Sequence, residues 1–417
     1  MSVERMISAP RIMRHVRAIT SFGPRVDGTQ ASRNAAGYVA KYLRECGCRV
    51  DLMPISFPVV KGLKCTLSVA PDGPVVPCLP NTRSALTHGP LEREAVFVDV
   101  GLDRDYEGRH VANKIVFAAE TSYWQGSNLP ATKYYRAIGH EAAGFVFSDR
   151  RNDEAITCWT MSPGIAPSPT VSIPYSSYAA LKARAAKNGG LKVSLRVTGK
   201  VERSVDYIVA GTMKGRRRHA GSVYIDGSHH ETVAHCPGAN DNASGIAVML
   251  ELARFLSSRQ LDQHIVFLST CAEECACYGI DRYLRTKRKG LAKAKASFVI
   301  DQIGGGNAGI IERGIAYDEK SGLVPTNTYY ASDKTLVQAL MKSARRFGYH
   351  LPVYRQPAGG FGEAGSFARE GVPSVFLCGW NTDIAYHTSL DGLDKISANG
   401  LKPFAEILAD TILRGCH

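Results

Sequence analysis

The stretch from Gly227 to Gly245, GSHHETVAHCPGANDNASG, constrains the fold of this chain more than any other. Strand-like residues 222–225 lead into it, and a helical pattern leads out of it. His229 would stand just beyond the carboxyl end of the strand, and Asp241 follows a short Pro-Gly loop. In α/β proteins, ligands bind outside the carboxyl ends of the strands. We therefore predict that both side chains are metal ligands.

A helix is expected after this stretch because its apolar residues recur at the spacing of one helical face. They are Ile246, Met249, Leu250, Ala253 and Leu256. Asn242 or Ser244 can cap the first free amides of such a helix. The stretch is thus predicted to join a strand to a helix through a polar loop.

Polar residues follow three more strand-like runs further along the chain. Residues 264–269 precede the adjacent pair Glu273 and Glu274, residues 297–300 precede Asp301, and residues 374–377 precede a loop that contains His387. Two adjacent carboxylates at a strand end cannot both point the same way. One of them can bind a metal while its neighbour acts as a base on a water. The chain thus offers two His, two Asp and one Glu as ligands, and one further Glu.

The motifs GSHHE, PGANDNASG, the Glu273-Glu274 pair, IDQIG and YHTSLDGLDKI together resemble the successive signatures of a known enzyme family. This is the di-zinc exopeptidase family, metallopeptidase family twenty-eight, which includes bacterial leucine aminopeptidase, aminopeptidase Y and glutamate carboxypeptidase. The resemblance covers the chain almost end to end. It implies a metal-dependent exopeptidase.

The resemblance also implies a role for each candidate residue. The metal ligands would be His229 and Asp301 for one zinc ion, Glu274 and His387 for the other, and Asp241 as the bridge between them. Glu273 would be the general base that takes a proton from the zinc-bridging water. Zn²⁺ accepts imidazole and carboxylate ligands, and two ions about 3.5–4 Å apart can share one carboxylate. Two Zn²⁺ per chain are expected, with Co²⁺ or Mn²⁺ as alternatives.

This chain departs from the family pattern at two positions. The family usually has Asp two residues after the first His ligand, where it orients the imidazole ring, and here Glu231 takes that place. We expect the Glu231 carboxylate to reach the other ring nitrogen of His229, with an altered metal affinity rather than a lost site. Glu363 replaces a second Asp of the family. None of the five proposed ligands is missing.

The predicted activity is that of an aminopeptidase, which hydrolyses the amino-terminal peptide bond of a peptide. A dipeptidase, a carboxypeptidase and an amidohydrolase of small amides are alternatives on the same site, because the groups that select the substrate lie on loops. A non-catalytic binding protein on this scaffold is a remote alternative. Loss of ligands would mark such a protein, and every ligand is present here.

The sequence suggests two domains. Residues 1–60 and 200–417 are predicted to form the catalytic domain, a zinc-exopeptidase-like α/β fold with a twisted, mostly parallel sheet between helices. Residues 61–199 contain short strand-like runs and one helical run at 131–142. With GRHVANKIVFA, HEAAGFVF and SPTVSI, this range resembles the protease-associated domain, a smaller β-rich α+β insertion in many relatives. Trp124, Tyr134 and Tyr135 would line the active-site cleft or fill the small core of this domain.

The net charge of +13 comes largely from basic clusters at 214–218 and 287–289. We interpret them as a solvated turn, between paired strands at 206–212 and 222–225, and a helix end. Neither cluster is interleaved with aromatic residues that would stack on bases, so a nucleic-acid partner is not predicted. The expected partner is a peptide or small amide, and the oligomeric state is left open.

The cellular compartment is inferred from the amino terminus and the cysteines. The first 19 residues lack a continuous apolar stretch, and no run elsewhere reaches the roughly 20 residues needed to span a membrane. The eleven cysteines show no paired spacing, which favours reduced thiols. Cys271, Cys275 and Cys277 around the Glu pair are interpreted as packing residues rather than a thiolate metal site. We expect a cytoplasmic enzyme without membrane binding.

Overall fold

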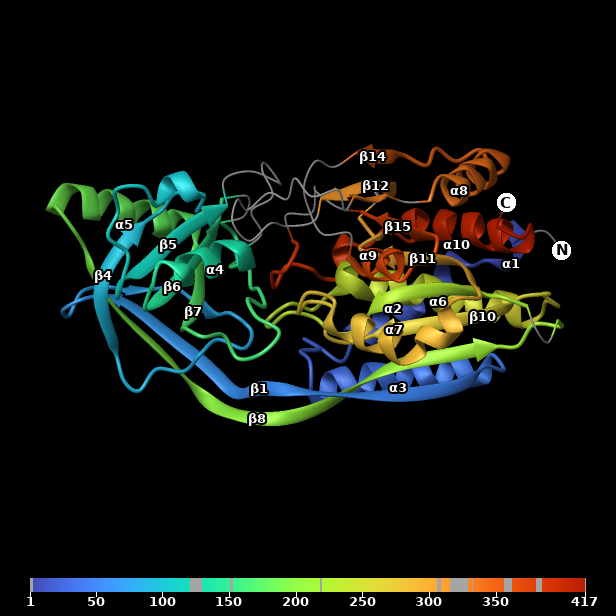
Figure 1. Cartoon of the computed structure of the whole chain (residues 1–417), viewed down its shortest axis with the longest axis horizontal. Helices are drawn as coiled ribbons and strands as arrows, with labels where there is room; N and C mark the ends of the chain where they lie inside the picture. The colour runs from blue at the N-terminus through green and yellow to red at the C-terminus, as the bar shows by residue number, and fades with distance from the viewer. Residues whose placement is uncertain are drawn as a thin grey trace.

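The structure of the protein is a computed structural model, which describes residues 3–120, 130–150, 153–217, 220–305, 309–315, 329–331, 333–355, 362–379 and 385–416. Figure 1 shows two lobes connected by two long strands, β1 (Arg49–Val69) and β8 (Lys192–Met213). These strands pair antiparallel along most of their length. Both ends of the chain lie in the larger lobe.

The larger lobe is built on a sheet with the strand order β13-β12-β15-β11-β9-β10-β8, and β1 pairs with β8. Its other strands are β9 (Ser222–His229), β10 (His264–Thr270), β11 (Ala294–Asp301), β12 (Gly309–Ile315), β13 (Tyr329–Ala331), β14 (Val353–Arg355) and β15 (Ser374–Cys378). The four central strands β15, β11, β9 and β10 are parallel, and β8 and β12 flank them antiparallel. The predicted parallel centre is confirmed, and its carboxyl ends share one edge of the sheet.

Helices cover both faces of this sheet, as predicted. One face carries α1 (Val3–Met6), α2 (Ala9–Thr20), α3 (Gln30–Glu45), α6 (Ser244–Ser257), α8 (Lys334–Arg346) and α10 (Ala398–Leu413), and the other carries α7 (Tyr278–Leu291) and α9 (Gly362–Arg369). Val223 and Ile225 of β9 pack into the first core, and Tyr224 packs into the second. Successive strand residues point to opposite faces, so a strand covered on both faces is apolar throughout.

The smaller lobe contains a second set of strands that continues from the other half of β8. They are β2 (Val75–Val76), β3 (Leu79–Pro80), β4 (Leu91–Phe97), β5 (Ile115–Glu120), β6 (Gly144–Asp149) and β7 (Thr170–Pro174), with the helices η1 (Asp103–Asp105), α4 (Pro130–Gly139) and α5 (Tyr175–Asn188). The strands β4 to β7 are parallel neighbours. The sequence did not predict α5, which buries only Tyr178 and Leu181 and so has little apolar periodicity. The assignment of 61–199 to a protease-associated domain stays a prediction.

The predicted pairing of strands 206–212 and 222–225 is wrong. The first range belongs to β8 and the second to β9, and β10 lies between them, antiparallel to β8 and parallel to β9. The basic cluster is therefore not a hairpin turn. Arg216 and Arg217 of this cluster both pair with Asp262, just before β10. Arg218 and Trp124 lie outside the described residues.

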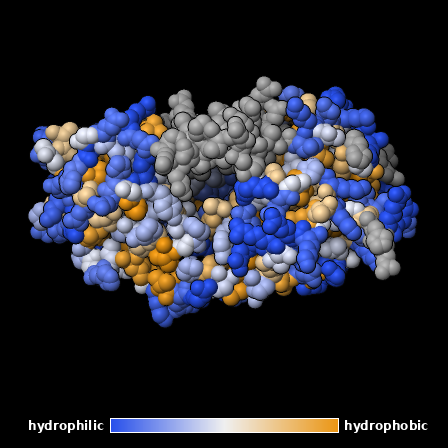
Figure 2. All heavy atoms as spheres, in the orientation of Figure 1, coloured by the Kyte–Doolittle hydropathy of each residue, from blue (hydrophilic) through white to orange (hydrophobic). Residues whose placement is uncertain are grey.

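The surface is largely polar. Figure 2 shows a mostly hydrophilic face with small hydrophobic groups, and this face is hollowed between the two lobes. Among the helices of the described ranges, none combines the length and the apolar character needed to cross a bilayer.

Candidate active site

The predicted site residues converge at the carboxyl edge of the parallel strands. His229 ends β9, Asp241 lies in the turn η2 (Ala239–Ala243), Glu273 and Glu274 follow β10, Asp301 ends β11, and His387 follows β15. Asp241 lies at the centre of this group. Its Oδ1 is 3.1 Å from His229 Nε2, and its Oδ2 is 3.3 Å from His387 Nε2. One carboxylate thus faces two different imidazoles.

Each imidazole also faces a second carboxylate. His229 Nε2 is 3.7 Å from Asp301 Oδ1, and His387 Nε2 is 3.0 Å from Glu274 Oε1. His229, Asp241 and Glu274 together offer ligand atoms that all lie within 4.8 Å of one another. The structure therefore brings the five predicted ligands together, with Asp241 between a His229–Asp301 pair and a Glu274–His387 pair.

The residues of this group fit a metal. Both Asp241 oxygens, Asp301 Oδ1 and His387 Nε2 are buried and have no hydrogen-bond partner in the part of the chain that the structure describes. Leaving buried polar atoms unpaired is costly, whereas coordination of a cation would satisfy them. Imidazole nitrogens and carboxylate oxygens form the donor set that Zn²⁺ accepts.

The electrostatics of the group also favour a cation. Burial lowers the pKa of His387, but the carboxylates of Glu274 and Asp241 outweigh it and raise this pKa to about 10. The pKa of His229 is also raised well above its usual value, because Glu231, Asp241 and Asp301 outweigh burial. The buried carboxylates therefore create a negative field that stabilises positive charge.

Glu273 occupies a different position from the ligands. It lines a cavity of about 270 Å³ together with Asp241, Glu274 and Asp301. Burial raises the pKa of the Glu273 carboxyl to about 8, against the opposing effect of His229. The Cys277 thiol lies 3.4 Å from Glu273 Oε1. Glu273 thus presents a carboxyl group to the cavity beside the proposed ligands.

The smaller lobe contributes to the wall of this cavity. Trp159 and Tyr135 line it, and the Trp159 ring centroid lies 4.4 Å from that of His387. The backbone N–H of Cys158 donates to the carbonyl oxygen of His387 at 2.9 Å. The smaller lobe therefore supports His387 directly, and the cavity lies between the lobes.

The predicted contact of the Glu231 carboxylate is wrong. His229 Nδ1 lies 3.0 Å from the backbone oxygen of Glu231, whereas the carboxylate Oε2 lies 3.8 Å from this nitrogen. The carboxylate Oε1 instead accepts from the backbone N–H groups of Glu273, at 2.5 Å, and Glu274, at 3.3 Å. The Glu231 carboxylate thus contacts the turn that follows β10. Glu231 therefore orients His229 through its backbone and the Glu273–Glu274 turn through its carboxylate.

Replacing Glu231 by Ala is expected to lower activity and metal retention about 10–100-fold, the usual effect of losing a group that positions ligands. The loss should concern a metal held by Glu274, because the carboxylate holds the Glu274 backbone. Glu231→Gln is the matched control, since its amide oxygen can still accept these hydrogen bonds. Chelator titration measures retention. Release only of the ion at His229 would contradict the assigned contact.

Two further residues position the Asp241 loop. Asp391 accepts from the backbone N–H groups of Asn240 and Asp241 at 2.7 and 3.0 Å. Asn242 Oδ1 accepts from the Gly245 N–H at 3.0 Å, which confirms the predicted cap, and its Nδ2 donates to the carbonyl of Ile300 at 3.0 Å. These contacts fix Asp241 between the ends of β9 and β11.

The backbone beside the proposed ligands adopts an uncommon conformation. Ser228, Ala272, Gln302 and His387 have positive φ angles of 54°, 59°, 51° and 58°. Non-glycine residues rarely adopt this left-handed conformation, and it concentrates at functional sites where the surrounding structure holds it in place. The sequence gives no signal for these positive φ angles.

Asp27 and Arg83 form a buried ion pair that the sequence analysis missed. Arg83 lies in the smaller lobe and donates to Asp27 Oδ2 at 3.1 Å and to Cys275 Sγ at 2.7 Å. Asp27 Oδ1 accepts from the backbone N–H of Ala272 at 2.9 Å, directly before Glu273. The pair therefore connects the smaller lobe to the turn that carries the proposed base.

Replacing Arg83 by Met is expected to destabilise the protein by about 3–5 kcal/mol, because Asp27 is left as an unpaired buried charge. The double variant Arg83→Met, Asp27→Asn removes both charges and should recover part of this loss, since Asn can still accept from Ala272. Denaturant unfolding of the four proteins of the cycle measures the coupling. A loss in the double variant equal to the sum of the losses in Arg83→Met and Asp27→Asn would show that the pair contributes no coupling.

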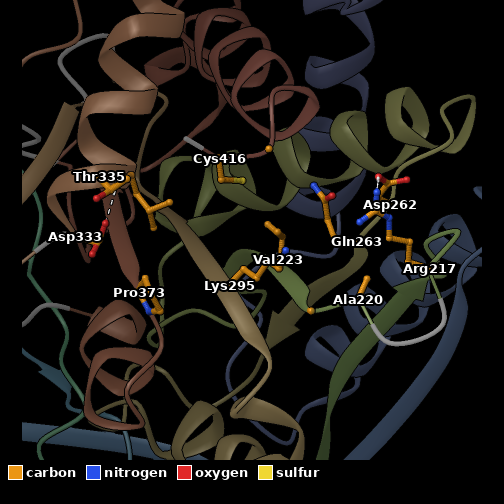
Figure 3. A pocket seen from close by; sticks show the side chains of 13 residues that line it. Arg217, Ala220, Val223, Asp262, Gln263, Lys295, Asp333, Thr335, Pro373 and Cys416 are labelled. Atoms are coloured by element: carbon orange, nitrogen blue, oxygen red, sulfur yellow. Dashed lines mark hydrogen bonds and ion pairs between the residues drawn. The ribbon is translucent and has the colours of Figure 1, made fainter.

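A larger cavity of about 750 Å³ lies at the opposite edge of the sheet. Figure 3 shows Val223 and Lys295, near the starts of β9 and β11, among its lining residues, with Cys416 nearby. It lies at the amino ends of the parallel strands. Ligands of such sheets bind at the carboxyl ends, so the smaller cavity beside Asp241 is the candidate active site.

The fold and the site define a metal-dependent hydrolase: an α/β sheet with imidazole and carboxylate donors at its carboxyl edge and one further carboxyl group in the adjoining cavity. Residues 209–412 match the model of "Peptidase family M28". Residues 209–412 therefore belong to this family, and the protein is a metallopeptidase.

Individual relatives extend over both lobes. The chain is 24% identical over 406 residues to aminopeptidase YwaD of Bacillus subtilis, which covers 94% of this chain and 81% of the relative. Its fold is similar to that of BSAP, a zinc aminopeptidase from Bacillus subtilis, with a TM-score of 0.76, 21% identity and coverage of 98% and 95% of the two chains. Its fold is also similar to that of an aminopeptidase from Aneurinibacillus sp. strain AM-1, with a TM-score of 0.73 and 23% identity. The match covers 99% of this chain and 95% of the other.

Proposed function

We propose that the protein is a zinc-dependent aminopeptidase that hydrolyses the amino-terminal peptide bond of peptides. The observation that carries this proposal is the Asp241 carboxylate between His229 and His387, each of which also faces a second buried carboxylate. Such a group has room for two cations that share one ligand. The names of YwaD and BSAP as aminopeptidases, and of BSAP as a zinc enzyme, support the choice of reaction and metal.

The side chains divide into holding groups and one reacting group. His229 and Asp301 would hold one zinc ion, and Glu274 and His387 would hold the other. Asp241 would bind both ions. When bound, zinc would supply the positive charge that polarises the scissile carbonyl and activates water.

Glu273 would perform the proton transfers. Its carboxylate takes a proton from the attacking water and delivers it to the leaving amine. Glu273 suits this role because its carboxyl group lines the cavity beside Asp241, Glu274 and Asp301, within reach of a water held there. The Glu231 carboxylate holds the backbone N–H of Glu273, so the base is fixed beside the cavity.

Leucine anilide, its amine-blocked derivative and a peptide with a blocked amine and a free carboxyl terminus test this proposal. The zinc-loaded protein is expected to hydrolyse the first and not the other two. Hydrolysis of the blocked peptide from its carboxyl end would favour a carboxypeptidase instead. The zinc content is measured in the same preparation after zinc reconstitution. A zinc content near zero would overturn the metalloenzyme proposal.

A further inference from the structure

Two cysteines of the smaller lobe lie side by side, one in a strand and the other just after a neighbouring strand. The Sγ atoms of Cys65, in β1, and Cys78, just after β2, are 3.3 Å apart. The two strands are antiparallel, with Leu67 opposite Val76. Continuing this register by two residues places Cys65 opposite Cys78. Their proximity therefore follows from the pairing of the strands.

The geometry suits a disulfide bond. A disulfide requires Cα atoms about 4.4–6.8 Å apart and sulfur atoms about 2.05 Å apart. Residues directly opposite in an antiparallel pair have Cα atoms about 4.5–5.5 Å apart. Rotation of the two thiols can therefore close the remaining gap between the sulfurs while the strands stay in register.

The two thiols differ in reactivity. The hydrogen bond from the Cys65 thiol, together with the backbone N–H of Leu67, outweighs burial and lowers the pKa of Cys78. The pKa of Cys65 is raised by the same hydrogen bond and by burial. Both residues are only partly buried, at the margin of the core that contains Leu67 and Val76. Cys78 is thus the better nucleophile, and Cys65 is placed to react with it.

We propose that Cys65 and Cys78 are a redox modification site, which a peroxide oxidises to a disulfide and a thiol reductant restores. The Cys78 thiolate attacks one peroxide oxygen, the O–O bond breaks, and the released hydroxide takes up a proton to leave as water. Cys65 then attacks the sulfur of the Cys78 sulfenic acid. The S–S bond forms, and the displaced hydroxide leaves as a second water with the Cys65 proton. Two electrons pass from the thiols to the peroxide.

Peroxide titration of the reduced, full-length protein tests this proposal, with alkylation of free thiols and mass spectrometry of the peptides. At an equimolar dose of hydrogen peroxide, the peptides of Cys65 and Cys78 are expected to be disulfide-linked, and dithiothreitol should release both. Cys46 is an internal comparison, because it is also partly buried and burial raises its pKa to about 11. Oxidation of Cys46 while both Cys65 and Cys78 stay alkylated would overturn the proposal.

Three variants separate the roles of the two thiols. Cys65→Ser should accumulate a Cys78 sulfenic acid, which a 1,3-dione probe detects, and Cys78→Ser should leave Cys65 reduced. Cys46→Ser is the matched control and should form the disulfide as the wild type does. Circular dichroism checks that each variant folds. Loss of the disulfide in Cys46→Ser, or equal sulfenic acid at Cys65 in Cys78→Ser, would contradict the proposal.

Discussion

Replacing Glu273 by Gln is expected to lower kcat about 10²–10⁴-fold, the usual contribution of a positioned acid or base, while the metal content stays unchanged. Gln has nearly the same shape but cannot take a proton from water. The contacts that join the proposed ligands run between His229 or His387 and the carboxylates of Asp241, Asp301 and Glu274, without Glu273. Turnover of leucine anilide and the zinc content of the same preparation measure the two quantities.

Glu274→Gln is the matched control for this experiment, because it changes the adjacent residue in the same way. It is expected to lose metal, since Glu274 Oε1 faces His387 Nε2 at 3.0 Å. A base must be ionised to act, so kcat/KM of the wild type should rise with pH through the pKa of Glu273, and this limb should vanish in Glu273→Gln. The two assignments would be reversed if Glu273→Gln kept near wild-type turnover while Glu274→Gln lost turnover and kept its full metal content.

The sequence pointed to most members of the site because His229, Glu273, Glu274 and Asp301 stand at or just after the end of an apolar strand, and Asp241 and His387 lie on the segments that follow β9 and β15. His229 and Asp301 end β9 and β11, which are adjacent and parallel, so their distance of 3.7 Å follows from the topology of the sheet. The apolar runs that form the central strands are continuous because helices cover both faces. Strand ends and ligand types are thus local features of the sequence, which pattern analysis can recognise.

The groups that position these residues could not be predicted in the same way. Asp27 accepts from the backbone of Ala272, 245 residues further along the chain, and Arg83 reaches it from the other lobe. Such contacts depend on packing between distant segments, for which a single sequence has no periodic signal. The predicted contact between the Glu231 carboxylate and His229 was wrong for a local reason. Ser228 has a positive φ of 54°, and the turn that follows brings the Glu231 carbonyl to the imidazole of His229.

The long strand that connects the lobes was also not predicted from the sequence. The sequence assigns residues 61–199 to an inserted domain and predicts a separate strand at 206–212, with the mostly polar residues 199–204 between them. In the structure, β8 continues through this range, paired with β1 on one side and exposed elsewhere. Cross-strand pairing supplies the backbone hydrogen bonds there, so the strand does not require an apolar face.

Replacing Asp241 by Ala is expected to remove both proposed metal ions and with them the hydrolytic activity. Asp241 offers one oxygen to each half of the site, at 3.1 Å from His229 Nε2 and 3.3 Å from His387 Nε2. Burial opposes its negative charge, but the two histidines outweigh burial and hold its pKa below the usual value. This charge would also offset the repulsion between two cations at close range, so its loss should weaken both positions together.

Metal analysis of Asp241→Ala after dialysis against a fixed concentration of free zinc measures this effect, with Asp301→Ala as the matched control. In the described part of the chain, Asp301 faces His229 rather than His387, so its loss should release one proposed ion and leave the other bound at Glu274 and His387. Asp241→Asn keeps the shape of the side chain and removes its charge, and it should retain less zinc than Asp301→Ala. Retention of one ion at wild-type affinity in Asp241→Ala would contradict the bridging role, because a bridge is the one ligand whose removal affects both positions.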